Sequence, residues 1–220
     1  MNERLHQASL QLKNANRLFL TFGTANVFRL KSTGEVVSNC HKLPASEFEM
    51  QLVNPKIIFS ELKQVFELLW QQHENLKIIL TVSPVRYFAF GMHENTVSKS
   101  YLFAAIQFLQ EEFEQLYYFP AYEILMDDLR DYRFYADDML HPSKIAIEYV
   151  WQKLSETFFD SDTQQLIGRI EKIIAAVNHR PRNSDSAAHK KFVTDTLLQI
   201  ELLEKNSGFN FENEKHRLKK

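Results

Sequence analysis

The sequence predicts a three-layer α/β fold with a mainly parallel sheet, followed by a helical hairpin. Short apolar runs of strand length alternate with segments of helical periodicity that are long enough to cross between parallel strands. Residues 77–82 form the clearest strand, because the run is apolar apart from Lys77 and Thr81 and stops at Ser83-Pro84. No strand pattern follows Asp160. We therefore expect an α/β domain over residues 1–160, a helical hairpin over 161–205 and a flexible tail over 206–220.

The individual elements follow from periodicity and turn residues. Residues 2–16 predict a short helix, and the apolar run 18–22 before Gly23 predicts a buried strand. The turn residues 31–35 predict a small hairpin. Asn54-Pro55 begins a helix that runs to about residue 72. The remaining predictions are a strand at 77–82, a helix from Ser98, a strand at 116–119, a short helix at 123–129, and helices over 142–158, 162–178 and 186–205.

Composition excludes several classes of protein. The net charge of −2 over 220 residues argues against nucleic-acid binding, which needs a concentrated basic surface. Cys40 is the single cysteine, so an internal disulfide is not possible. The sequence contains no long apolar span, no signal-peptide core, no P-loop, no G-x-G-x-x-G and no metal-ligand motif. We expect a cytoplasmic protein with no membrane partner, no cofactor and no metal.

The most informative motif is Asp137-Asp138-Met139-Leu140-His141-Pro142-Ser143, which precedes a predicted helix. It places an acid and an imidazole three residues apart on one loop, so that the two side chains can meet. In a hydrolytic triad the carboxylate accepts the imidazole Nδ1–H and leaves Nε2 as the general base. Asp138 and His141 are therefore catalytic candidates; the alternative is a capping aspartate beside a surface histidine.

Further candidates lie where ligands gather in parallel sheets, at the carboxyl ends of strands. Arg86 follows the 77–82 strand and can hold an anionic substrate group, or it is a sheet-end surface arginine. Asn39 can donate to an oxyanion, and His41 lies in the same polar cluster. Cys40 and His41 point to opposite sides of an extended segment, which argues against their reacting together.

Five segments resemble the GSCFA domain family, a bacterial branch of the SGNH/GDSL hydrolase superfamily. They occur in register between about Leu18 and Phe159, with a looser match at 178–181. In order, the segments are Phe22-Gly23-Thr24-Ala25, Ser38-Asn39-Cys40-His41-Lys42-Leu43-Pro44, Thr81-Val82-Ser83-Pro84-Val85-Arg86, Tyr118-Phe119-Pro120-Ala121-Tyr122-Glu123, and Leu129 to Ser143.

The resemblance implies a flavodoxin-like sheet and serine esterase or acyl-hydrolase chemistry. Asp138 and His141 would correspond to the final D-x-x-H block of the superfamily. Gly23-Thr24 would correspond to its G-x-N-D oxyanion block, but no Asn-Asp follows the glycine here, so Asn26 or Asn39 would substitute.

A second departure concerns the nucleophile. The Gly-Ser-Cys-Phe-Ala segment that gives the family its name does not occur in the 220 residues, so the sequence resembles the later part of an N-terminally truncated domain. We expect an ester hydrolase domain, acting on an acyl-ester small molecule or carbohydrate, with little activity as this chain. Its 18–22 strand would become an apolar sheet edge open to self-association. The alternatives are a non-catalytic interaction module and an enzyme that uses Ser83 or Cys40 as nucleophile.

Overall fold

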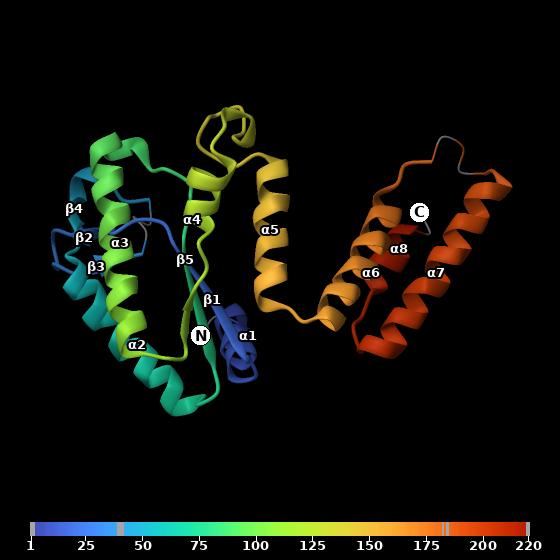
Figure 1. Cartoon of the computed structure of the whole chain (residues 1–220), viewed down its shortest axis with the longest axis horizontal. Coiled ribbons are helices and arrows are strands. Elements are labelled where there is room, and N and C mark those ends of the chain that lie inside the picture. The colour runs from blue at the N-terminus through green and yellow to red at the C-terminus, as the bar shows by residue number, and fades with distance from the viewer. Residues whose placement is uncertain (1–2, 39–41, 182, 184, 219–220) are drawn as a thin grey trace. The chain divides into compact units, whose positions relative to one another are not determined.

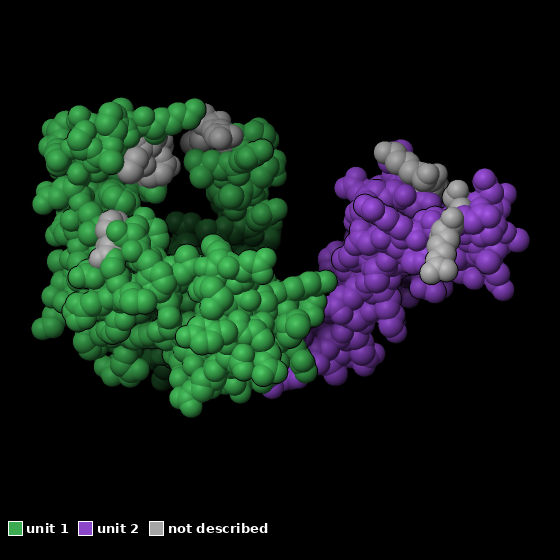
Figure 2. Space-filling model, turned by 90° about the horizontal axis from the view of Figure 1, so that it is seen from above, with its two compact units in different colours: residues 1–152 green, residues 153–220 purple. Residues whose placement is uncertain are grey.

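The chain forms two compact units, residues 1–152 and 153–220, which Figure 2 distinguishes by colour. A computed structural model describes residues 3–38, 42–181, 183 and 185–218. The first unit is mixed α/β and the second is helical. Within the described residues, no helix combines the length and the apolar character needed to cross a bilayer.

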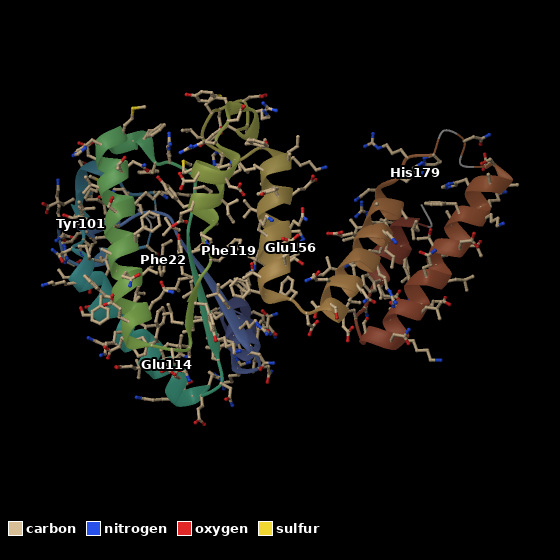
Figure 3. All side chains as sticks on the ribbon, viewed as in Figure 1. Phe22, Tyr101, Glu114, Phe119, Glu156 and His179 are labelled. Carbon is tan, nitrogen blue, oxygen red and sulfur yellow. The ribbon has the colours of Figure 1, made fainter. Side chains whose placement is uncertain are left out.

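The main sheet of the first unit is parallel and has the strand order β1-β5-β6. Its strands are β1 (Arg17–Phe22), β5 (Lys77–Val82) and β6 (Leu116–Tyr118). Phe119, labelled in Figure 3, donates its N–H to the Leu80 carbonyl and so extends the pairing by one residue. This sheet and the helices around it confirm the predicted α/β class. Among the described strands, β1 pairs only with β5, which makes β1 an edge strand.

The core of the first unit centres on β5, in which five of six side chains are buried. The helices α2 (Pro55–Gln72) and α3 (Met92–Glu112) pack on one face of the sheet (Figure 1). As predicted, Asn54 caps α2 by accepting a hydrogen bond from the Lys56 N–H. The buried apolar side chains of this core cluster are Ala25, Phe66, Leu76, Ile78, Leu80, Val82, Leu102, Ile106, Leu109 and Leu116.

A second, antiparallel sheet has the order β3-β2-β4. It contains β2 (Asn26–Leu30), β3 (Val36–Val37) and β4 (Phe48–Leu52), and a one-turn helix, η1 (Ala45–Glu47), precedes β4. The β2–β3 pair confirms the predicted hairpin. Strand β4 was not predicted, although its sequence alternates apolar and polar residues as a half-buried strand does.

One helix of the first unit begins earlier than the sequence predicted. Helix α1 (Glu3–Lys13) agrees with prediction, but α3 begins at Met92 rather than at Ser98, after the short helix η2 (Phe88–Phe90). Gly91 precedes it with φ +104°, a conformation that residues with a Cβ rarely adopt. The Gly91 carbonyl then accepts the Asn95 N–H, which starts the helix one turn and a half early.

The chain between β6 and α5 (Lys144–Phe158) forms the other side of the unit. Helix α4 (Ala121–Glu123) continues into the π-helix η3 (Ile124–Leu129), and the short helix η4 (Tyr132–Phe134) follows. Leu125, Leu129 and Ala146 are buried together, so η3 packs directly against α5. The π-helix ends at Arg130, which is left-handed with φ +40°.

The second unit contains α6 (Ser161–Asn178), α7 (Ala187–Ser207) and α8 (Glu212–Leu218). Asp160 and Ser186 cap the first two helices, and these two helices agree with the predicted hairpin. The expected flexible tail instead contains α8. Phe211 is buried against Ile173, Ile200 and Leu203, and Lys215 forms a 2.7 Å ion pair with Glu204, which together hold the last helix.

Replacing Phe66 with alanine should strongly destabilise the first unit, because the ring is fully buried beneath the sheet. We expect the free energy of unfolding to fall by about 3–5 kcal/mol, as measured by urea denaturation. Val65, the preceding residue of α2, is 49% exposed, so Val65→Ala serves as the matched control. Equal losses in the two variants would contradict this assignment of the core.

Candidate functional site

The candidate site lies at the carboxyl edge of the parallel sheet. Three segments contribute to it: residues 23–26 after β1, residues 83–87 after β5, and the loop 135–143 before α5. Because Phe22 pairs with Val82, the first two segments leave the sheet side by side. The third segment meets the second at a cavity that both Arg86 and Tyr135 line. The sequence predicted that these segments would lie at one edge.

Backbone hydrogen bonds close the loop that carries Asp138 and His141. Tyr135 and Pro142 form an isolated antiparallel bridge, and the Ala136 N–H donates to the His141 carbonyl over 2.8 Å. Inside the loop, Asp138 Oδ1 accepts the N–H groups of Leu140 and His141, both at 2.9 Å. Asp138 therefore shapes the backbone that presents the histidine.

The other oxygen of the same carboxylate orients the imidazole. Asp138 Oδ2 lies 2.6 Å from His141 Nδ1. The backbone N–H and ring of His141, with the Leu140 N–H, hold the pKa of Asp138 down at about 2. An ionised carboxylate can only accept, so Nδ1 carries the proton and Nε2 of a neutral ring is left as a base. Within the described part of the chain, Nε2 has no hydrogen-bond partner, and the side chain is 62% exposed.

One turn of α3 holds the two strand-end segments in place. Ser98 Oγ lies 2.8 Å from Thr24 Oγ1 and accepts the Ala25 N–H at 2.7 Å. Lys99 Nζ donates to the carbonyls of Gly23 and Ser83, at 2.7 and 2.6 Å. One turn earlier, Asn95 Oδ1 accepts the Tyr87 N–H. These α3 side chains form a polar clamp of Asn95, Ser98 and Lys99, all of which are buried.

The polar clamp was not predicted from the sequence, although a signal for it exists. Asn95, Ser98 and Lys99 continue the spacing of Leu102, Ile106 and Leu109, the inner face of α3. Polar residues that extend an apolar stripe are expected to be buried and hydrogen-bonded. Lys99 is only 2% exposed, and its burial lowers the pKa of its ammonium to about 8.

The segment after β1 uses most of its polar groups internally. Thr24 Oγ1 accepts both the backbone N–H and the side-chain amide of Asn26, and the Ala25 N–H is bound by Ser98. Asn26 and Ala25 therefore do not offer their backbone donors to an oxyanion. The oxyanion roles of Gly23 and Thr24 stay predictions. Asn39, Cys40 and His41 lie outside the described residues.

Ser83 is held as a turn residue. Its Oγ accepts the Val85 N–H at 3.2 Å, and its carbonyl accepts from Lys99. Across the described ranges, no hydroxyl or thiol is hydrogen-bonded to the His141 ring. No group of three described His, Cys, Asp or Glu residues is arranged to hold a metal ion.

A cavity of about 270 Å³ lies between the second and third segments. Met126 on η3 lines it and contacts both segments, because its Sδ accepts from Arg86 Nη2 at 3.2 Å and from the Tyr135 hydroxyl at 3.6 Å. The cavity thus joins the strand-end arginine to the loop of the Asp138–His141 pair. Its lining residues are Arg86, Leu125, Met126, Arg130, Asp131, Tyr132, Tyr135 and Met139.

The Asp138 carboxyl should titrate near pH 2, well below its ordinary value near 3.8. In His141→Ala the ring donor is lost while the two backbone donors stay, so the pKa should rise toward the ordinary value. Carboxyl ¹³C shifts followed by NMR across pH 1–6 measure both midpoints. Because the pKa of Asp138 is lower in the folded state, its ionised carboxylate stabilises the fold above pH 4. This stabilisation is lost as the pH falls through 2. An unchanged midpoint in the variant would show that the ring does not bind the carboxylate.

Lys99→Met should destabilise the first unit by about 1–3 kcal/mol at pH 7, because the Gly23 and Ser83 carbonyls lose their donor. The pH dependence should also change. With a folded pKa of about 8 and an ordinary value of 10.5, the unfolded state binds more protons between these values. Wild-type stability should therefore gain from Lys99 as pH rises from 8 to 10.5, and the variant should lack that gain.

Guanidinium unfolding at several pH values measures this difference, with the exposed Lys144→Met as the control. Parallel pH profiles for the wild type and Lys99→Met would contradict a buried, titrating Lys99.

Comparison with known proteins places the chain in a family. A model of the GSCFA family matches residues 1–154, and a model of the GSCFA domain protein C-terminal domain matches residues 170–220. The first match covers the strands, the polar clamp and the Asp138–His141 loop, and the second covers most of the helical unit. Comparison with curated proteins and with solved structures found no match. The chain belongs to the GSCFA family.

Proposed function

We propose that the first unit is the acid–base part of an SGNH-type ester hydrolase, with His141 as general base and Asp138 as the residue that orients it. The observation that carries this proposal is the 2.6 Å contact between Asp138 Oδ2 and His141 Nδ1. It leaves Nε2 exposed on a loop that lines a cavity at the carboxyl edge of a parallel sheet.

The chemistry requires a hydroxyl group that reaches Nε2. His141 would take the hydroxyl proton as the oxygen attacks the ester carbonyl, and would return it to the departing alcohol. Water, deprotonated by the same nitrogen, would then release the acid from the acyl-enzyme. Asp138 would stay ionised throughout and stabilise the imidazolium, as its low pKa supports.

No hydroxyl of the described residues is hydrogen-bonded to Nε2 of His141. This supports a nucleophile that is supplied by a segment outside the described residues. The resemblance of the sequence to SGNH hydrolases suggests the serine of a Gly-Ser-Cys-Phe-Ala segment. By this proposal the chain by itself has little ester-hydrolase activity, since an oriented imidazole has only water to activate.

The test compares the chain alone with the chain fused to the Gly-Ser-Cys-Phe-Ala region of a GSCFA relative. With 4-nitrophenyl acetate, we expect no acylation burst from the chain alone and a burst from the fusion. His141→Ala in the fusion should lower the rate by about 10²–10⁴-fold. His6→Ala, on the exposed helix α1, is the control and should keep the rate.

Two results would refute the proposal. The first is a burst from the chain alone, which would reveal a nucleophile within it. The second is a fusion whose burst persists in His141→Ala, which would remove the general base from the mechanism.

A further inference from the structure

The cavity beside the Asp138–His141 loop has an unbalanced charge. Arg86 and Arg130 line it from two different elements, the segment after β5 and the end of η3. Asp131 also lines it, but both of its oxygens are engaged by Arg133, Oδ1 by the backbone N–H and Oδ2 by the guanidinium, at 2.9 Å each. The negative charge of Asp131 is therefore balanced by Arg133, which is not among the residues that line the cavity. Across the part of the chain that the structure describes, the positive charges of Arg86 and Arg130 have no such partner.

Arg86 is poorly satisfied where it lies. A guanidinium has five N–H donors. Within the described residues, the half-buried guanidinium of Arg86 donates to the thioether of Met126, which is a weak acceptor. Among the described residues, no carboxylate lies within ion-pair distance of Arg86 or Arg130. A partly desolvated cation without an acid partner favours an anionic ligand.

The remaining lining groups suit an anion attached to a larger molecule. The Tyr135 hydroxyl points to the same sulfur atom as Arg86, and Tyr132 is 76% exposed at the cavity. Leu125 and the two methionines supply apolar surface. The cavity thus combines a cationic end with aromatic and apolar walls, which fits an organic acid or phosphate ester rather than a free ion.

We propose that this cavity binds the anionic group, a carboxylate or a phosphate, of the substrate whose ester bond lies at His141. Arg86 and Arg130 would hold the anion, and the loop that carries Met139 and His141 would set the distance to the scissile bond. The placement of the anion next to the reacting ester bond rests on the proposed function. Binding of the anion itself requires only the two arginines.

The test measures binding without catalysis, by isothermal titration of the full chain with phenyl phosphate, benzoate and benzyl alcohol. We expect at least one anionic probe to bind about tenfold or more tightly than the neutral alcohol. Arg86→Gln and Arg130→Gln should each weaken that probe by about tenfold. Arg17→Gln, at the opposite end of the sheet, is the matched control and should bind as the wild type does.

The pattern of results separates this proposal from the proposed function. Preference for phenyl phosphate or for benzoate identifies a phosphate or a carboxylate substrate, and either preference supports the inference. Equal affinity for benzyl alcohol, or full affinity in Arg130→Gln with its fold intact, would overturn the inference even if the fusion hydrolyses esters. A fusion whose hydrolysis does not need His141 would refute the function while leaving the binding result untouched.

Discussion

The parallel pairing of β1 with β5 is the constraint on which the first unit depends. Its register, with Phe22 opposite Val82, brings the carbonyls of Gly23 and Ser83 together just beyond the sheet. One ammonium group, that of Lys99, can therefore bridge both. A shift of one residue in β1 would turn its half-buried side chains, Leu18, Leu20 and Phe22, away from the core and separate the two carbonyls. The geometry of the site follows from this alignment, because the segment that Lys99 holds leads directly to Arg86.

Much of the fold follows from local sequence patterns. The apolar run of β5 and the Asn54-Pro55 start of α2 are strong signals, because each satisfies both local conformation and burial. The errors lie where tertiary contacts decide the conformation. The helix predicted at 123–129 is present, but the sequence did not distinguish its π-helical form, η3, which packs against α5. Helix α8 is held by Phe211 and by an ion pair with α7, neither of which periodicity reveals.

The candidate site likewise has features that local sequence patterns predicted and features that depend on tertiary contacts. The Asp138–His141 pair was predictable because both residues lie on one loop, where a spacing of three lets the side chains meet. The polar clamp of α3 and the two-arginine cavity were not predicted, since each joins residues far apart in the sequence. Arg86 and Met126, for example, are brought together only when the end of β5 lies beside η3. The spacing of Ser98 and Lys99 on the inner face of α3 indicated their burial, but not the carbonyls that they would meet.

The two oxygens of Asp138 serve different partners, and this division determines how a change at that position acts. Asparagine would retain an oxygen for the amides of Leu140 and His141, so the turn would survive. Its NH₂ group would face Nδ1 and donate to it, because an amide nitrogen cannot accept. The proton on the ring would then move to the outer nitrogen. An intact turn would present an imidazole of the opposite tautomer, a hydrogen-bond donor where the native protein offers a lone pair.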